Sequence, residues 1–367
     1  MTQAPESRSA RERVYEALKA GPGTRPELAS RTGLSVVSVI AAVDELASQR
    51  LALLEDTPPP SGRGRPAARV RLNTEGFRIT ALDLGSPTVA CGRYNLLAEP
   101  EEVQQFGNPY QLLSNQPEHN LNLIHQWLSL HGPADVVAIS MVGSINPRTR
   151  TVTHPVLGFH DFPLESQLSA RLGCPVLLEN DANLAAWHTW HHLEMQKEDP
   201  LAFLNYSYGL GLGLMLGGQM YHGATGGAGE ISFAADPSKR VRHQPLAERL
   251  IGHLQEVNPS GSIEEVSVQA AQGDRRAKQA LKLYMQDLAN HLTAVVAMLD
   301  PAILVLQDIP HAAEPLLQET LRALSELHLP TRVMVSPLGP LGGLDSAGAY
   351  GARWLERQKL FGTPSEN

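Results

Sequence analysis

The sequence predicts an α/β protein that carries a separate helical unit at its N-terminus. Segments with the patterns of strands and helices alternate from residue 77 to the end of the chain, as they do in α/β folds. Three short helical patterns separated by glycine turns come before them, within residues 11–51. We therefore predict one domain over residues 1–73 and a larger domain over residues 74–367.

The composition is typical of a soluble globular protein, with 42% hydrophobic and 19% charged residues among 367. No apolar run is long enough to span a membrane, and the first residues contain no apolar signal core, so we expect a cytoplasmic protein without a membrane partner. Two cysteines make neither a disulfide framework nor a cysteine zinc cluster. The net charge of −8 is uneven: residues 1–72 hold 11 Lys/Arg against 8 Asp/Glu, whereas the rest hold 19 against 30, which favours a polyanionic partner for the N-terminal part.

The N-terminal unit has the pattern of a helix-turn-helix. A first helix is expected over residues 11–20, where glycine and proline stop it. Thr24 and Glu27 form a capping box at the start of a second helix, which ends at Gly33. Ser35 then caps a third helix, whose apolar face is Val39, Val43 and Leu46. A short helix, a tight turn and a longer helix are typical of DNA-binding units.

Two strand patterns, at residues 51–55 and 68–73, flank a basic loop and would complete a wing. In this interpretation the third helix enters the major groove, and two wing arginines reach phosphates or the minor groove. The residues predicted to contact DNA are Ser35, Val36, Ser38, Arg63 and Arg65.

The alternative for this unit is a small helical domain that makes protein contacts. The exposed start of the third helix is expected to be Val36, Val37, Ser38, Ala41 and Ala42, without an Arg, Lys, Asn or Gln to read a base edge. Base readout would then depend on Ser38, and the wing arginines would carry much of the affinity.

A glycine-rich stretch over residues 207–230 is the most unusual part of the larger domain. Leucines alternate there with glycines at 209, 211 and 213, which predicts a strand with one face free of side chains. The loop GATGGAGE that follows cannot be regular structure, and it ends on the carboxylate of Glu230. One interpretation is a floor that binds phosphate and sugar; the other is a hairpin packed closely against a neighbouring element.

Polar side chains follow two other predicted strands. Asp83 ends one strand and precedes a turn of small residues, which suits phosphate contact or an ordinary hairpin. The strand at 174–180 leads into Asp181, and the sequence Glu-Asn-Asp-Ala-Asn at 179–183 lies at a strand-to-helix junction, where ligands bind in α/β folds. Asp181 there could take a proton from a sugar hydroxyl, or it could serve only as a helix cap.

The order of these motifs resembles the ROK family (repressors, open reading frames and kinases), in particular its repressor branch. The resemblance covers residues 11–360 and rests on a winged helix with GRGRPA, then DLGSPT, ENDAN and GATGGAGE. It implies a winged helix-turn-helix followed by a two-lobed actin-like ATPase domain of the ROK sugar kinase type, with the lobes meeting near residues 181–200. Kinase members phosphorylate sugars with ATP, and repressor members bind operators as dimers or tetramers that a sugar or a partner protein tunes.

The resemblance also assigns roles to residues. Asp181 matches the catalytic base, and Asn180 and Glu230 match ligands of sugar hydroxyls. The positions that match the two phosphate loops are Asp83, Gly85, Thr88, Gly209 and Gly211.

Departures from the family pattern indicate a degraded nucleotide site. The first phosphate loop has an inserted proline, Pro87, and lacks one glycine; the second has Ser207-Tyr208 in place of Gly-Thr; and Gln307-Asp308 replaces a glycine pair on the adenosine side. Phe233 stands where the family has a zinc-binding histidine, and no cysteine cluster follows it. We therefore expect no ATP and no zinc, with Asp181 as a vestigial base.

Three functions are consistent with these residues. The first is a transcriptional regulator that binds double-stranded DNA as a homodimer or homotetramer and responds to a sugar or sugar phosphate in a kinase-like cleft. The second is an ATP-dependent sugar kinase with an N-terminal extension. The third is a protein-interaction module that has lost both activities.

Overall fold

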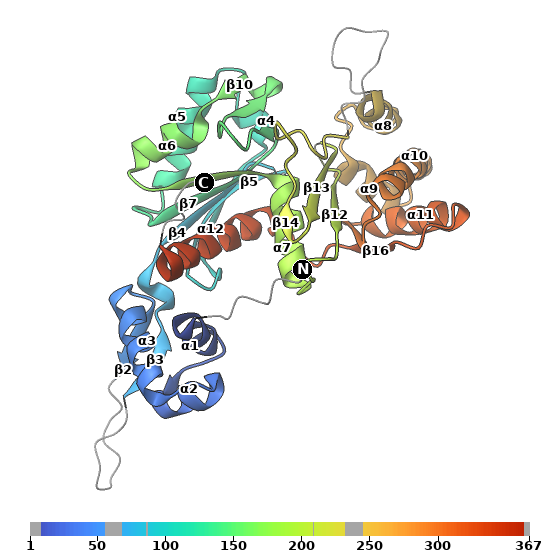
Figure 1. The fold of residues 1–367 in the computed structure, drawn as a ribbon. Helices are drawn as coiled ribbons and strands as arrows, with labels where there is room; N and C mark the ends of the chain where they lie inside the picture. Colours follow the sequence, from blue (N-terminus) through green and yellow to red (C-terminus); the bar gives the residue numbers. More distant parts are fainter. Residues whose placement is uncertain (1–8, 56–67, 86, 208, 232–244, 363–367) are drawn as a thin grey trace.

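The computed structural model describes residues 9–55, 68–85, 87–207, 209–231 and 245–362. Three parts follow one another in these residues: an N-terminal unit of helices and a hairpin, a first five-stranded sheet and a second five-stranded sheet (Figure 1). Within these ranges no helix is both long and apolar enough to cross a membrane.

The N-terminal unit packs three helices against a small antiparallel sheet. Its elements are α1 (Ala10–Lys19), β1 (Gly23–Thr24), α2 (Arg25–Thr32), α3 (Val36–Ser48), β2 (Ala52–Glu55) and β3 (Arg69–Leu72). The capping box of Thr24 and Glu27 forms as predicted, and Gly33 ends α2 with a φ of 65°, a conformation that favours glycine. Val39, Val43 and Leu46 of α3 are fully buried, which confirms the apolar face predicted for this helix.

The first sheet has the strand order β11-β7-β4-β5-β6, with β4, β7 and β11 parallel and β5 and β6 antiparallel. Helices α5 and α6 and a small sheet of β8, β9 and β10 accompany it. The bounds of its elements are η1 (Thr74–Gly76), β4 (Ile79–Asp83), β5 (Val89–Tyr94), β6 (Pro100–Gly107), α4 (Pro109–Leu112), α5 (Pro117–Ser129), β7 (Val136–Met141), β8 (Ser144–Ile145), β9 (Val152–His154), η2 (Pro155–Leu157), β10 (Phe159–Phe162), α6 (Leu164–Leu172) and β11 (Val176–Asn180).

The second sheet has the order β14-β13-β12-β15-β16, and helices α8 to α11 form a separate hydrophobic core with it. In Figure 1 these helices lie on the side of the molecule away from the first sheet. The bounds are β12 (Leu201–Asn205), β13 (Gly211–Leu216), β14 (Gln219–Met220), α8 (Pro245–Gln255), α9 (Ile263–Ala271), α10 (Arg275–Leu299), β15 (Ile303–Leu306), α11 (Ala313–Glu326) and β16 (Arg332–Val335).

Two helices connect the parts. Helix α7 (Asp181–His192) begins where β11 of the first sheet ends and packs on β12 and β13 of the second. Helix α12 (Gly342–Phe361) is the last element of the chain, yet it packs on β4 and β7 of the first sheet and on α7. Glycine permits this approach, because a Cβ on Gly348 would lie 2.6 Å from the Tyr94 ring and one on Gly351 would lie 2.8 Å from Ile79.

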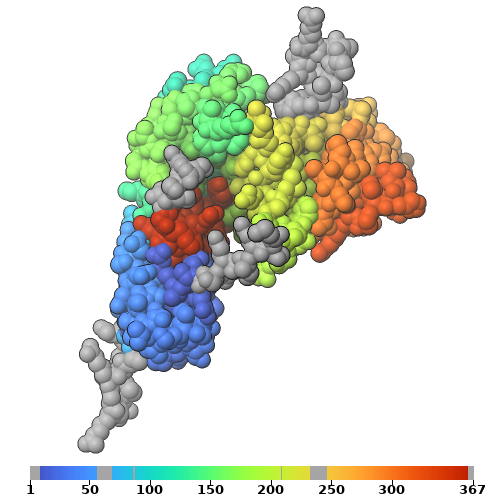
Figure 2. All heavy atoms as spheres, viewed as in Figure 1, coloured from blue at the N-terminus to red at the C-terminus, as the bar shows by residue number. Residues whose placement is uncertain are grey.

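A single hydrophobic core joins the N-terminal unit to the first sheet through α12. It contains Val14 and Leu18 of α1 together with Leu355 and Leu360 of α12. Figure 2 shows the red surface of α12 between the blue N-terminal unit and the green first sheet. The core therefore crosses the predicted domain boundary at residue 73.

Local patterns predicted several regular elements well, because α2 and α3 begin at the predicted caps Thr24 and Ser35. The sequence analysis missed β1, because its pairing partner β3 is distant in sequence. It also missed β6, which is mostly exposed and lacks a buried face, and the short strands β8 and β10. It also placed Ala42 on the exposed face of α3, which was wrong: Ala42 is 3% exposed, whereas Ile40 is 39% exposed.

The close packing of β13 on α7 makes a testable prediction. A Cβ on Gly213 would lie 1.8 Å from the carbonyl oxygen of Ala182, and a backbone atom cannot move aside as a side chain can. Gly213→Ala should therefore reduce the free energy of unfolding by at least ~2 kcal/mol in urea titrations. Gly209→Ala is the matched control, since no described atom lies within 4 Å of that position, and its effect should stay within about 0.5 kcal/mol. Equal effects of the two changes would contradict the packing.

Candidate functional site

The candidate site forms where three strands of the first sheet end together. The register pairs Asp83 of β4 with Ser140 of β7, and Ser140 with Glu179 of β11, so these side chains form one row across the sheet. Because β4, β7 and β11 are parallel, their carboxyl ends meet at the same edge, and Asn180 and Asp181 follow directly at that edge. This is the position of ligand sites in open α/β sheets.

Asn180 and Asp181 form the start of α7. The Asn180 side chain caps the helix, because its Oδ1 accepts a hydrogen bond from the Asn183 amide at 3.1 Å, and its Nδ2 donates to the Gly143 carbonyl at 3.1 Å. Asn205, at the end of β12, donates its Nδ2 to Asp181 Oδ2 at 2.7 Å. The junction thus joins the ends of strands from both sheets around the carboxyl group of Asp181.

The carboxyl group of Asp181 is strongly perturbed. Burial, together with the charges of Asp83 and Glu230, raises its pKa to about 8, although the backbone hydrogen bond at Ala182 acts in the opposite direction. Asp181 is therefore mostly protonated at pH 7, because its ionised form would be a buried charge beside two other carboxylates. The charges of Asp83 and Glu230 act on Asp181, so both carboxyl groups belong to its electrostatic surroundings.

The loop that carries Glu230 packs on the first sheet at one point and on strand β8 of the small sheet at another. His222 Nε2 lies 2.9 Å from Oε2 of the buried Glu179, and this hydrogen bond raises the pKa of His222 although partial burial lowers it. Gly226, with a φ of 82°, packs so closely on Ile145 that a Cβ would lie 2.0 Å from its carbonyl oxygen. The second half of the glycine-rich stretch is therefore an ordered loop that spans the two sheets.

The glycines assigned to phosphate loops have different surroundings. Gly85 lies against Asp181, since a Cβ there would meet the Asp181 Cβ at 2.5 Å, and its amide donates to Asp83 Oδ1 at 2.9 Å. Thr88 is partly exposed beyond that turn. Gly209 and Gly211 are open or nearly so, with Ala182 Cβ at 3.9 Å as the nearest atom to a Cβ on Gly211. Gly213 of β13 differs from them, because the backbone of Ala182 packs directly against it.

The residues predicted to contact DNA lie at the start of α3. Ser35 caps the helix by accepting from the Ser38 amide at 3.1 Å, and the two serine hydroxyls bond each other at 2.8 Å. Val36 is 43% exposed. Arg63 and Arg65, the wing arginines, lie outside the described residues, and their contact with DNA stays a prediction.

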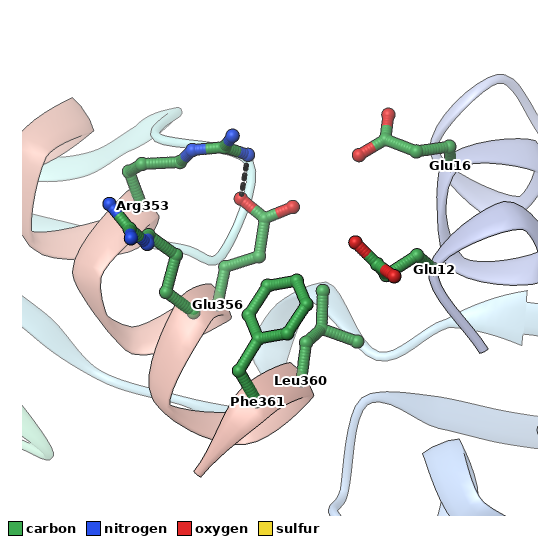
Figure 3. Close-up of a pocket in the computed structure, with 7 residues that line it drawn as sticks. Glu12, Glu16, Arg353, Glu356, Leu360 and Phe361 are labelled. Atoms are coloured by element: carbon green, nitrogen blue, oxygen red, sulfur yellow. Dashed lines mark hydrogen bonds and ion pairs between the residues drawn. The ribbon is translucent and has the colours of Figure 1, made fainter. Parts of the chain in front are cut away.

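A charged seam lies between α1 and α12, around a cavity of about 80 Å³ (Figure 3). Glu356 of α12 has a side chain only 5% exposed, and it accepts hydrogen bonds from Lys19 Nζ and from Arg353 Nη1, both at 2.9 Å. Glu12 and Glu16 point from α1 toward the same helix in Figure 3. At its other end α12 lies against the site, because a Cβ on Gly343 would lie 2.3 Å from Asp83 Oδ2. One helix therefore touches both the candidate site and the N-terminal unit.

The sequence analysis predicted that the chain binds no metal. In the part of the chain that the structure describes, no three His, Cys, Asp or Glu side chains lie together in a way that could hold a metal ion. Phe233 and the segment that follows it lie outside the described residues, so the absence of a zinc site stays a prediction. His188, which shares α7 with two other histidines, is bonded to Ser346 of α12 at 3.0 Å, and burial lowers its pKa to about 4.

Sequence reasoning missed Asn205, His222 and Gly143 as parts of the site. Asn205 carried a usable signal, since it is the first polar residue after four buried apolar residues of a strand. His222 and Gly143 carried none, because their partners, Glu179 and Asn180, are 43 and 37 residues away along the chain.

Two sheets whose strand ends and connecting helix surround a buried carboxyl group define an actin-like α/β protein of the sugar-kinase type. The chain belongs to the ROK family, whose model matches residues 79–235 and 248–359. Similar proteins include the xylose repressor of Bacillus spizizenii, 25% identical over 226 residues that cover 59% of this chain and 58% of the repressor. The bifunctional enzyme NanE/NanK of Brucella melitensis is 32% identical over 167 residues, covering 44% of this chain and 31% of the enzyme. This chain thus spans little more than half of the first relative and a third of the second.

Two solved structures show the same fold. A ROK family transcriptional regulator described as a homologue of the E. coli MLC protein has a TM-score of 0.71 at 20% identity, over 95% of this chain and 96% of that chain. The ROK family glucokinase from Streptomyces griseus, in complex with glucose and AMPPNP, has a TM-score of 0.62 at 19% identity, over 74% of this chain and 98% of that chain.

The perturbed carboxyl group of Asp181 predicts a pH-dependent effect of its removal. The folded-state pKa of Asp181, about 8, lies above the unfolded value of 3.8. The unfolded state therefore releases this proton more readily, and the folded state loses stability as the pH rises between these two values, with the full loss reached above pH 8. Asp181→Asn removes the ionisable group and should raise the free energy of unfolding by about 2 kcal/mol or more at pH 8.5, and by less at pH 5. The control is Asp44→Asn, an exposed carboxylate, whose effect should not depend on pH in this range. A constant difference between Asp181→Asn and the wild type from pH 5 to 8.5 would contradict this assignment.

The seam predicts that Glu356 stabilises the contact between α1 and α12. Glu356→Gln leaves Lys19 and Arg353 without their carboxylate and should reduce the free energy of unfolding by about 1–3 kcal/mol in urea titrations. Glu326→Gln is the matched control on α11, because that side chain is 63% exposed beside Arg322 and should change stability by less than about 0.5 kcal/mol. Equal losses in the two variants would show that the seam does not hold α12 in place.

Proposed function

We propose that this chain is a transcriptional regulator, most directly a repressor, that binds operator DNA through its N-terminal winged helix-turn-helix. A sugar or sugar phosphate in the cleft of the larger domain regulates this binding, and the cleft no longer transfers phosphate. The regulator acts as a homodimer or homotetramer, as symmetric operators require of a DNA-binding unit present once per chain. The similarity to a xylose repressor supports this class of function.

The observation that carries the proposal is the shared core between the N-terminal unit and α12. A DNA-binding unit that only extended a kinase would need no such contact with the effector domain. Here Val14 of α1 and Leu355 of α12 belong to one hydrophobic core, and Lys19 of α1 donates to the buried Glu356. The other end of α12 lies against Asp83 at the candidate site. A ligand bound there would therefore lie next to the helix that supports the N-terminal unit.

The polar groups at the start of α7 support a sugar as the effector. Protonated Asp181, Asn180 and Glu230 combine donors and acceptors in one place, and sugar hydroxyls both donate and accept hydrogen bonds. A neutral polyol also brings no charge into a site that already holds three carboxyl groups.

An ATP-dependent sugar kinase with an N-terminal extension is the second candidate. Asp181 at the end of a strand, in the place of a catalytic base, favours it, as does the relative NanE/NanK. Contacts on the nucleotide side oppose it. The Gln307 side chain accepts from the Tyr206 amide at 3.1 Å, and Ser207 donates to the Glu264 carboxylate at 2.5 Å, which places a negative charge beside the glycine hairpin. Sugar-dependent release of ADP that Asp181→Asn abolishes would support the kinase instead.

The proposal predicts salt-sensitive binding to DNA from upstream of the protein's own gene, measured by fluorescence anisotropy with unrelated DNA as competitor. Replacing both wing arginines, Arg63→Ala with Arg65→Ala, should weaken binding and reduce the slope of log affinity against log salt by about 2, since two phosphate contacts are lost. A control pair of exposed arginines in the larger domain, Arg275→Ala with Arg332→Ala, should leave both quantities unchanged. Binding no tighter than to the competitor would refute the regulator.

A further inference from the structure

The first two turns of α3 expose an apolar surface that the N-terminal unit itself does not use. Val37 is 76% exposed, Val36 43% and Ile40 39%, and Ala41 beside them is exposed as well. The core of the unit is already filled by the opposite face of the same helix, where Val39 is fully buried. Three large aliphatic side chains together at the start of a short exposed helix need a partner outside the unit.

The polar groups at this end of α3 are occupied. The Ser35 and Ser38 hydroxyls bond each other, and Ser35 also caps the helix. The helix sequence VVSVIAAVDELAS contains no Arg, Lys, Asn or Gln, the side chains that read base edges through paired hydrogen bonds. The surface that α3 presents over its first two turns is therefore mostly aliphatic, with Ser38 as a partly exposed polar side chain within it.

Charge favours DNA over a protein as the partner of this surface. The acidic residues of α3 lie in its last turns, where Asp44 is 3.9 Å from Arg25 and Glu45 is 3.7 Å from Arg11. The start of the helix is thus free of acidic groups and carries the positive end of the helix dipole. Residues 1–72 have an excess of three positive charges, whereas the rest of the chain has an excess of eleven negative ones.

The position of the apolar surface on α3 also favours DNA as its partner. In a helix-turn-helix, the residues at the start of the second helix of the motif meet the edges of the bases. The apolar turns of α3 are those that follow the tight turn at Gly33, and the charged turns are those that point back toward α1 and α2 through Arg11 and Arg25.

We propose that α3 recognises the C5-methyl groups of thymine in the major groove, with Val37 as the central contact and Val36 and Ile40 beside it. The thymine methyl is the apolar group that base edges present in that groove, and Ala, Val and similar side chains complement it by contact rather than by hydrogen bonds. This inference rests on the proposed DNA-binding function and adds its specificity: the operator carries thymines in register with these three side chains.

The test removes only the methyl groups. Binding sites are selected from random duplexes with the full-length protein, and each thymine of the best site is replaced in turn by deoxyuridine, which lacks the methyl but pairs identically. Anisotropy titrations should show about fourfold weaker binding for each methyl that α3 contacts. In Val37→Ala the corresponding loss should shrink to less than about twofold at the thymine that Val37 meets. Val268→Ala, an exposed valine on a helix of the larger domain, should keep the full loss.

The outcomes separate this inference from the function on which it rests. If the protein binds no duplex in a salt-sensitive way, the DNA-binding function itself fails. Salt-sensitive, sequence-selective binding without any deoxyuridine effect would overturn methyl recognition alone, and the apolar surface would then belong to a protein partner. A deoxyuridine effect that Val37→Ala leaves at full size would show that another element reads the thymines and would equally overturn the assignment to α3.

Discussion

The close packing of α12 is the constraint on which the arrangement of this chain depends. Three glycines, Gly343, Gly348 and Gly351, lie so near to Asp83, Tyr94 and Ile79 that a Cβ at any of them would lie closer than 3 Å to its neighbour. Without side chains at these positions, the last helix fits into the first sheet beside the candidate site. Its far end then supplies the surface on which the N-terminal unit packs. Because packed cores shift between discrete arrangements and do not deform smoothly, a change at the edge of β4 would also move the support of the N-terminal unit.

The second constraint is electrostatic. Asp83, Asp181 and Glu230 are close enough for their charges to raise one pKa to about 8, and burial accounts for the largest part of that shift. Such a cluster is costly to ionise and also difficult to leave without hydrogen-bond partners. A polyol adds no charge to such a cluster, and its hydroxyls can donate to ionised oxygens and accept from protonated ones. A polyphosphate would add charge of the same sign, which is why the electrostatics of this site favour a sugar over a nucleotide.

The sequence predicts elements whose cause is local, and it fails where the cause is a distant contact. The start of α2 follows from the capping box of Thr24 and Glu27, and the start of α7 follows from the polar junction at Asn180. The hydrogen bond between His222 and Glu179 and the return of α12 to the first sheet join residues far apart in the chain, so no local pattern predicts them. Within α3, the exposed face was predicted to include Ala42, whereas Ala42 is buried and Ile40 is exposed, because the helix was oriented without its packing partners.

The proposed function uses two groups of contacts differently. Around Asp181, Asn180 caps α7 and Asn205 donates to the carboxyl group. At the glycine hairpin, Gln307 accepts from the Tyr206 amide and Glu264 accepts from Ser207. Kinase chemistry would need a phosphoryl donor held in line with a sugar hydroxyl, and this second group of contacts opposes it. A sugar sensor would need only the groups around Asp181 and a connection to the N-terminal unit, and α12 lies against both. The contacts therefore support the proposed sugar-responsive regulator over the kinase.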